Sequence, residues 1–299
     1  MDGCVRERFV VVDDFLPTDQ SAGMRADIDA HFSKPSEHLP ATHQVWNYWH
    51  VPGSYTYLRT TPEKVIALAT VEAFVAALRD WAARNLGLAG VTWPYLSLYV
   101  PGCVQGLHND STNGRLGFVY SLTRNERQTL GGETLLMHER DLFRTSLDQA
   151  AAGTDLFDLV APRFNRLTLF DDRIPHAVQR LDGSMDPLEG RFVLHGHISE
   201  AGAVTQGALA PEAIQAQVNA LAEELQGLSA AQGVHGPFVT CAEITAGGEV
   251  QRSRPILDRL ASSADADIDA VRSAVAERIG ALRFPAADAP TRANIPLIF

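Results

Sequence analysis

Hydrophobic positions change their spacing along the chain, and each change predicts a different kind of element. Residues 9–16, FVVVDDFL, form a short apolar run that predicts a buried strand. After Pro17 the apolar positions follow a helical period, with one face formed by Met24, Ile28 and Phe32. Residues 40–60 are aromatic and irregular, and a second helix is expected over about 62–86.

After Gly87 the pattern changes to short runs separated by turn residues such as Pro101-Gly102 and Gly131-Gly132. These runs predict six strands, over 91–100, 115–123, 132–137, 163–170, 176–181 and 191–199. Helices followed by half a dozen short strands are typical of an α+β domain built on a β-sandwich or barrel.

Beyond Gly202 the pattern changes again. Pro211 opens a helix that ends near Gly227, and its narrow apolar seam is formed by Ile214, Val218, Leu221 and Leu225. A linker is expected at 229–237, followed by a small β-β-α-β unit. We therefore predict three parts: a domain over 1–200, a helix and linker over 201–234, and a small α/β domain over 235–299.

Composition excludes several classes of protein. The 299-residue chain carries a formal net charge of −11, which argues against a nucleic-acid partner. No apolar stretch approaches the roughly 20 residues that span a bilayer, and no secretory segment opens the chain. Its three cysteines are too few and too far apart for a disulfide framework. We expect a cytoplasmic protein that binds neither nucleic acid nor membrane.

Four residues suggest a metal site. His108 and Asp110 form a His-X-Asp pair, His176 begins a later strand, and Arg191 begins the strand after that. Two neutral imidazoles and one carboxylate can occupy one face of an octahedral metal and leave three positions open. Fe(II) suits this set, and the open positions admit a bidentate oxo acid and then O₂. The second carboxylate of that acid needs a fixed cation, which a forked guanidinium provides.

Strand periodicity predicts which side chains share a face. His108 and Asp110 are both expected to point inward, with the residue between them pointing out. On the strand 191–199, Arg191 shares its face with His195. His195 is then either a contact for the substrate or the metal site, or an ordinary packed histidine.

Residues 94–199 resemble the double-stranded β-helix core of the Fe(II)- and 2-oxoglutarate-dependent oxygenases, in the prolyl-4-hydroxylase-like branch. The stretches that carry this resemblance are LSLYVPGCVQGLHND, LGGETLLM and NRLTLFDDRIPHAVQRL…GRFVLHGHI, and FVVVDDFLP extends it to about 200 residues. It implies a jelly-roll, cupin-like fold with flanking N-terminal helices.

By position, the resemblance implies that His108, Asp110 and His176 bind the iron and that Arg191 binds the distal carboxylate of 2-oxoglutarate. Tyr99 matches a tyrosine that often hydrogen-bonds the same cosubstrate. The branch often has a second tyrosine three residues before the first ligand, where this chain has Gln105. The cofactors implied are Fe(II), 2-oxoglutarate and O₂.

The implied activity is a dioxygenase that hydroxylates an unactivated C–H bond and releases succinate and CO₂. Halogenases of this superfamily have a small residue where this chain has Asp110, so the carboxylate favours hydroxylation; desaturation and demethylation stay open. The alternative is a non-catalytic scaffold that combines a vestigial barrel with an interaction domain.

The substrate is open: a small molecule, an amino acid or a peptidyl residue would each fit. Arg115, Arg124 and Arg127 either clamp an anionic group of the substrate or lie in solvated loops. The aromatic residues of 44–58 either form a lid over the barrel or cover a helix.

Residues 235–299 resemble the C-terminal domain of TonB-type proteins, on the pattern CAEITAGGEVQRSRPIL…ADIDAVRSAVAERIGALRFPA. The resemblance implies a small sheet with an exposed edge, to which another chain can add a strand. A homodimer, or a carrier or peptide partner, is expected there; the alternative is that the unit only supports the first domain.

Overall fold

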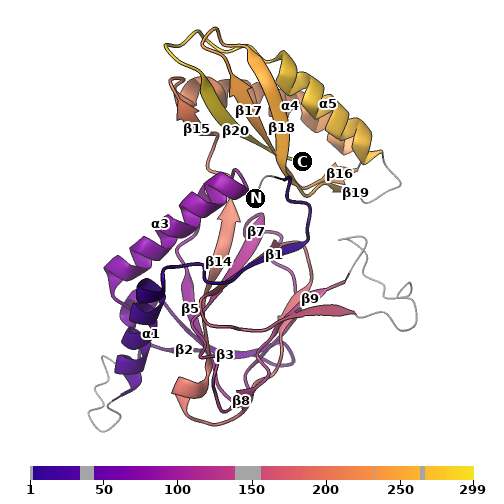
Figure 1. Cartoon of the computed structure of the whole chain (residues 1–299). Helices are drawn as coiled ribbons and strands as arrows, with labels where there is room; N and C mark the ends of the chain where they lie inside the picture. Colours follow the sequence, from indigo (N-terminus) through magenta and orange to yellow (C-terminus); the bar gives the residue numbers. More distant parts are fainter. Residues whose placement is uncertain (1–2, 34–43, 139–155, 232, 263–266) are drawn as a thin grey trace.

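A computed structural model describes residues 3–33, 44–138, 156–231, 233–262 and 267–299. It contains a large curled antiparallel sheet, helices along one side of that sheet, and a second, smaller sheet with its own helices (Figure 1). The predicted mixture of helices and antiparallel strands is confirmed. Within the described residues no helix is long and apolar enough to cross a membrane.

The large sheet has the strand order β1-β11-β7-β14-β5-β3-β6-β12-β9-β10, with β2 paired to β3 and β4 paired to β14. Its strands are β1 (Phe9–Val12), β2 (Asn47–Val51), β3 (Tyr55–Thr60), β4 (Gly90–Val91), β5 (Tyr95–Tyr99), β6 (Val104–His108), β7 (Leu116–Ser121), β9 (Thr134–Met137), β10 (Phe157–Val160), β11 (Arg166–Asp171), β12 (His176–Val178) and β14 (Arg191–Ser199). A separate ribbon pairs β8 (Thr129–Leu130) with β13 (Asp182–Gly183), and 3₁₀ turns occupy Pro62–Lys64 and Pro187–Glu189.

One face of the large sheet is apolar and packs against two helices, α1 (Thr18–Phe32) and α3 (Leu68–Asn85). The alternation along β14 shows how the sequence produces this: Phe192 and Leu194 join the core beneath the helices, whereas Arg191 and His195 line a cavity on the opposite face. The helices therefore close one face of the sheet and leave the other for a site.

The expectation of irregular structure over 40–60 is wrong for its latter part, because β2 and β3 form a hairpin around Gly53, whose φ is +76°. Residues 40–43 lie outside the described residues. The sequence does not indicate this hairpin because β3 turns Tyr55, Tyr57 and Arg59 toward a partly polar cavity. A strand with aromatic and charged residues on its inner face lacks the usual contrast between apolar and polar positions.

The second sheet has the order β15-β20-β17-β18 and encloses a separate apolar core with two helices. Its elements are β15 (Val204–Gly207), α4 (Pro211–Ala231), β17 (Pro237–Ile244), β18 (Val250–Asp258), α5 (Ile268–Ala281) and β20 (Thr291–Ile298), with a small ribbon of β16 (Val234–His235) and β19 (Ala261–Ser262). The apolar seam of α4 packs into this core. The domain boundaries at 200 and 234 stay a prediction.

The edge of β18 is partly covered by the start of the chain. Val5 donates its N–H to the carbonyl of Ile256 at 2.9 Å and accepts the N–H of Asp258 at 2.9 Å. This segment lies next to β18 in parallel orientation. Strand addition by another chain, as implied by the TonB-like pattern, stays a prediction; at β18 only the remainder of the edge is available, and β15 forms the other edge of the sheet.

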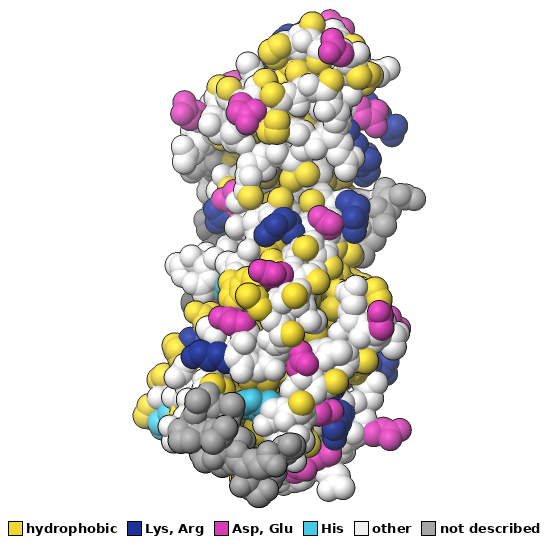
Figure 2. Space-filling view, turned by 90° about the vertical axis from the view of Figure 1, so that its left-hand side faces the viewer, with side chains coloured by type: hydrophobic (Ala, Val, Ile, Leu, Met, Phe, Trp, Pro, Cys, Tyr) yellow, Lys and Arg dark blue, Asp and Glu magenta, His cyan; other side chains and the backbone are white. Residues whose placement is uncertain are grey.

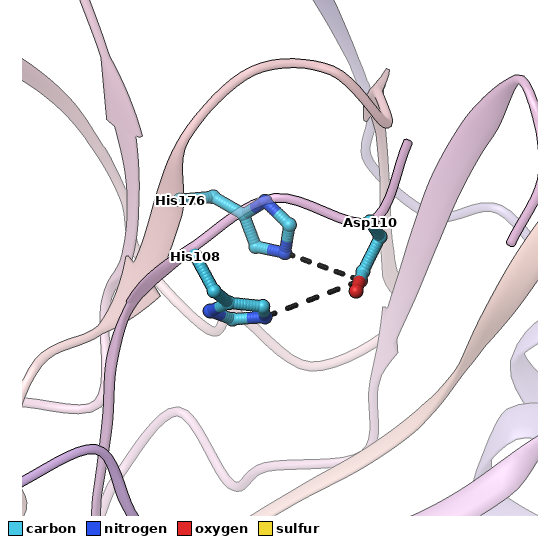
Figure 3. A group of neighbouring side chains, drawn as sticks. All are labelled: His108, Asp110 and His176. Carbon is cyan, nitrogen blue, oxygen red and sulfur yellow. Dashed lines mark ion pairs between the residues drawn. The ribbon is translucent and has the colours of Figure 1, made fainter. Parts of the chain in front are cut away.

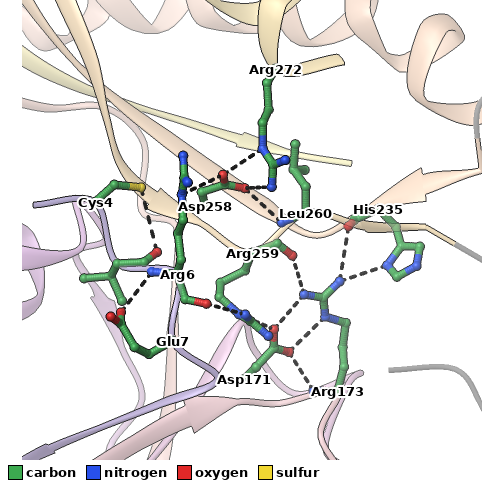
Figure 4. Close-up of polar contacts among 11 residues, drawn as sticks. Cys4, Arg6, Glu7, Asp171, Arg173, His235, Asp258, Arg259, Leu260 and Arg272 are labelled. Carbon is green, nitrogen blue, oxygen red and sulfur yellow. Dashed lines mark hydrogen bonds and ion pairs between the residues drawn. The ribbon is translucent and has the colours of Figure 1, made fainter. Parts of the chain in front are cut away.

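A buried ionic cluster joins the two sheets (Figure 4). The carboxylate of Asp171 accepts hydrogen bonds from Arg173 and Arg259, and Arg173 also donates to the carbonyls of His235 and Arg259. Asp171 is the last residue of β11 and lies five residues before His176. The smaller unit therefore holds the segment that carries one of the candidate metal ligands.

Surface charge is mixed. On the face shown in Figure 2, the described basic and acidic side chains are interspersed rather than gathered into a patch of one sign. The expectation that nucleic acid is not a partner stays a prediction from the acidic net charge.

Candidate active site

The structure brings His108, Asp110 and His176 together (Figure 3). His108 ends β6 and His176 begins β12, and the two residues lie opposite each other in the antiparallel pair. Their ring centroids are 4.3 Å apart. The Oδ2 atom of Asp110 lies 3.5 Å from Nε2 of His176 and 4.0 Å from Nε2 of His108.

This geometry fits a bound metal. Neighbouring ligands of an octahedral ion with bonds of about 2.1 Å lie about 3 Å apart, so the separations of 3.5 and 4.0 Å would shorten when a metal binds. Each imidazole makes a hydrogen bond from Nδ1 to a backbone carbonyl, His108 to Gly106 at 2.8 Å and His176 to Ile174 at 2.9 Å. Nδ1 is then the protonated nitrogen, so the lone pair of Nε2 faces the centre of the cluster.

The charges of the cluster also suit a metal. Burial and the neighbouring His176 lower the pKa of His108, which favours the neutral, ligating imidazole. Burial by itself raises the pKa of Asp110, but at the acidic pH where a carboxyl titrates the hydrogen bond from His176 and the charges of protonated His176, His108 and His197 outweigh it and lower the pKa to about 2. The site therefore offers two nitrogen lone pairs and one ionised carboxylate.

The position of Asp110 differs from the strand-based expectation. β6 ends at His108, and Asp110 lies in the turn that follows. The backbone N–H of Asp110 bonds the carbonyl of Asp172 at 2.8 Å, and its own carbonyl accepts the N–H of Asn113. A turn held from both sides, rather than strand alternation, brings the carboxylate to the two imidazoles.

Arg191 lies in the wall of the same cavity and is 2% exposed. Nη2 donates to Oγ1 of Thr134 at 3.2 Å, and the guanidinium lies over the ring of Tyr99, 4.9 Å from its centroid. Nε is buried without a hydrogen-bond partner, and among the described residues no carboxylate forms an ion pair with Arg191. A buried cation with an unused donor is costly unless an anion binds it.

Tyr99 lies between Arg191 and the metal cluster. Its hydroxyl donates to Oε1 of Gln105 at 3.0 Å, and Nε2 of Gln105 is 3.1 Å from Nε2 of His108. The departure from the oxygenase pattern at position 105 therefore puts an amide between Tyr99 and the first histidine. Burial raises the pKa of Tyr99, so the hydroxyl keeps its proton.

The cavity has a volume of about 550 Å³, within the range of small-molecule sites. His195 lines it and makes a 2.8 Å hydrogen bond between Nε2 and the hydroxyl of Ser97. Burial lowers the pKa of His195 to about 3, so this side chain is neutral. Both sequence interpretations hold in part, because His195 is packed and also faces the cavity.

Two functional candidates were missed by sequence reasoning. His197 and Asp172 form a pair beside Asp110, with Nδ1 of His197 3.0 Å from Oδ2 of Asp172. Arg59 lines the cavity from β3. The shared face of Arg191, His195 and His197 on one strand could have indicated His197, but no sequence pattern distinguishes Arg59.

The three arginines considered for the substrate are engaged elsewhere. Arg115 pairs with Glu200 at 2.8 Å, and Arg124 pairs with Asp29 at 3.1 Å and Glu189 at 3.5 Å. Arg127 donates to backbone carbonyls, and none of the three lines the cavity. The ion pairs of Arg115 and Arg124 make these two arginines structural.

The aromatic segment covers a helix at one end and lines the cavity at the other, and its role as a lid stays a prediction. Trp46 stacks on Phe32 of α1, with ring centroids 6.0 Å apart, and thus covers a helix. Trp49, Tyr55 and Tyr57 instead line the cavity.

No protein-family model and no curated protein matches the chain. Solved structures resemble it over about two thirds of its length. A prolyl hydroxylase from Trichoplax adhaerens, in complex with a hypoxia inducible factor peptide fragment, has 16% identity and a TM-score of 0.45, and the match covers 63% of this chain and 81% of that chain. A Pseudomonas putida prolyl-4-hydroxylase has 18% identity and a TM-score of 0.43, with coverage of 64% and 92%. The non-heme alpha ketoglutarate dependent epimerase SnoN from nogalamycin biosynthesis has 13% identity and a TM-score of 0.46, with coverage of 66% and 78%.

Proposed function

We propose that this protein is an Fe(II)- and 2-oxoglutarate-dependent oxygenase that hydroxylates a C–H bond of a small molecule or peptidyl residue. The proposal rests mainly on one observation. A buried guanidinium with an unused donor, Arg191, lines the same cavity as a cluster of two imidazoles and one carboxylate. A metal site beside a fixed cation suits a ligand that both chelates a metal and carries a distant carboxylate.

The residues have distinct roles in this proposal. His108, Asp110 and His176 would hold Fe(II), which when bound supplies the oxygen chemistry that releases succinate and CO₂. Arg191 would bind the distal carboxylate of 2-oxoglutarate and thereby orient its keto acid end toward the metal. Tyr99, beneath the guanidinium, would support the same carboxylate. In this interpretation the curled sheet is a double-stranded β-helix.

The first test is spectroscopic. Fe(II) and 2-oxoglutarate added without oxygen are expected to produce a weak metal-to-ligand charge-transfer band in the visible. Arg191→Gln removes the cation, and we expect at least tenfold weaker binding of 2-oxoglutarate, because a charged hydrogen bond contributes about 1.5–3 kcal/mol. Fe(II) affinity is expected to persist, since Arg191 is not a ligand.

The control is Arg79→Gln, an exposed arginine on α3 that is expected to leave the band unchanged. Thermal unfolding shows whether each variant folds. A properly folded wild-type protein that binds Fe(II) and forms no band with 2-oxoglutarate would contradict the proposal. It would favour the scaffold alternative.

A further inference from the structure

The cavity contains a second cation that the proposed function does not use. Among the side chains that line it, the basic ones other than histidine are Arg191 and Arg59. Opposite Arg59 on β5 is Ser97, and opposite Arg191 is Tyr99, two residues further along the same strand. With strands about 4.8 Å apart and about 3.4 Å per residue, the two Cα atoms are roughly 12 Å apart. The arginines therefore mark two separate positions in one cavity.

Arg59 is held between two aromatic rings. Its Cζ atom lies 3.7 Å from the ring centroid of Trp49 and 4.0 Å from that of Tyr95. Trp49 comes from β2 and Tyr95 from β5, the strands on either side of β3, so the rings flank the guanidinium. Both contacts are within the range of cation–π interactions, which use the face of each ring and leave N–H donors of the guanidinium for a ligand.

Among the residues that the structure describes, no carboxylate pairs with Arg59. Tyr57 shares a hydrogen bond with Arg59, but within the part of the chain that the structure describes no ion pair involves Arg59. Other half-buried arginines, such as Arg115 and Arg124, have carboxylate partners. Arg59 stands apart because its donors border an open cavity rather than an acidic side chain.

The rim beside Arg59 is aromatic and accessible. Trp49 is 40% exposed, Trp93 41% and Tyr95 43%, and all three line the cavity. Large exposed aromatic side chains gathered at a cavity entrance are typical of ligand contacts. A carboxylate is a planar anion that can lie in the plane of the guanidinium and accept two parallel hydrogen bonds from it.

We propose that the substrate carries a carboxylate and that Arg59 binds it between Trp49 and Tyr95. This inference rests on the proposed function, in which Arg191 and the metal cluster hold the cosubstrate. Arg59 then anchors the far end of the substrate and presents another part of it to the metal. The substrate class is a free carboxylic acid of a small molecule or of a peptide.

Binding of matched probes tests this inference without turnover. The protein is loaded with Mn(II) and saturated with 2-oxoglutarate, so that the position at Arg191 is filled. N-acetyl amino acids with several side chains are compared with their C-terminal amides and with monoalkyl phosphates. Tryptophan fluorescence reports binding, since Trp49 and Trp93 line the cavity.

We expect at least one acid to bind at least tenfold more tightly than its amide, the contribution of a charged hydrogen bond. Arg59→Gln should abolish this preference, Arg59→Lys should keep part of it, and the exposed control Arg79→Gln should keep all of it. Unfolding curves establish that the variants are folded.

Three results would overturn the inference: no acid preferred over its amide, a preference that survives Arg59→Gln, or phosphates that bind more tightly than acids. Failure here is distinct from failure of the proposed function. If the Fe(II)–2-oxoglutarate band forms and the preference is absent, only the role of Arg59 falls. If the band is absent, the oxygenase proposal falls whatever the probes show.

Discussion

Replacing Asp171 by asparagine tests whether the contact between the two sheets supports the metal site. The side chain of Asp171 is 0% exposed, and those of Arg173 and Arg259 are 12% and 11% exposed. The carboxylate accepts four hydrogen bonds, at 2.6, 2.9 and 3.0 Å from Arg173 and at 3.1 Å from Arg259 (Figure 4). Asp171→Asn removes the negative charge and leaves two largely buried cations side by side.

Breaking a buried ion pair by removing one partner costs about 3–5 kcal/mol, because the other charge is left without compensation. We expect Asp171→Asn to lower the free energy of unfolding by that amount at pH 7. Metal affinity should also fall, by about tenfold, because the segment after Asp171 carries His176 and the Ile174 carbonyl that orients it.

The assays are urea unfolding followed by circular dichroism and titration with Mn(II). The control is Asp182→Asn, which breaks the exposed pair of Arg180 and Asp182, where the side chains are 63% and 66% exposed. An exposed pair contributes at most about 1 kcal/mol. A loss of stability in Asp171→Asn no larger than in the control would refute the reasoning.

The stability that the Asp171 carboxylate contributes depends on pH with a definite sign. Burial raises the pKa of Asp171, but the hydrogen bonds and charges of the arginines outweigh this effect. The pKa is therefore lowered below its unfolded value of about 3.9. The carboxylate therefore contributes its full stability above about pH 4, and this contribution is lost as the pH falls through the lowered folded pKa. The difference in stability between wild type and Asp171→Asn should shrink in that acidic range.

Two further predictions concern the site itself. Asp110→Ala is expected to lower metal-dependent release of succinate from 2-oxoglutarate more than about 100-fold, because it removes one of three ligands. Asn109→Ala, at an exposed neighbour, is the control. Undiminished release in Asp110→Ala would exclude Asp110 as a ligand. Gly132 has a φ of +80°, and a Cβ there would lie 3.0 Å from Cδ of Arg191 and from Cδ1 of Leu181. Gly132→Ala should therefore destabilise the fold by about 1 kcal/mol and weaken 2-oxoglutarate binding in a charge-transfer titration. Gly227→Ala, where a Cβ meets nothing within 4 Å, should do neither.

The chemistry of the candidate site was readable in the sequence because it depends on residue types in a fixed order. His176 and Arg191 each begin a predicted strand, whereas His108 and Asp110 lie between the predicted strands 91–100 and 115–123, and β6, which ends at His108, was not among the predicted strands. The alternation along 191–199 also predicted correctly that Arg191 and His195 share a face. These inferences need only local periodicity and the coordination chemistry of side chains.

Other features depend on contacts between distant parts of the chain, which no local pattern encodes. Arg115 and Arg124 differ from Arg59 only in what the fold places beside them: carboxylates for the first two, and two aromatic rings for the third. By itself the sequence determined which side chains could form a metal site and which residues share a face along 191–199. Only the tertiary structure decided which charges are neutralised and which face the cavity, because sheet order selects neighbours that are far apart in the chain.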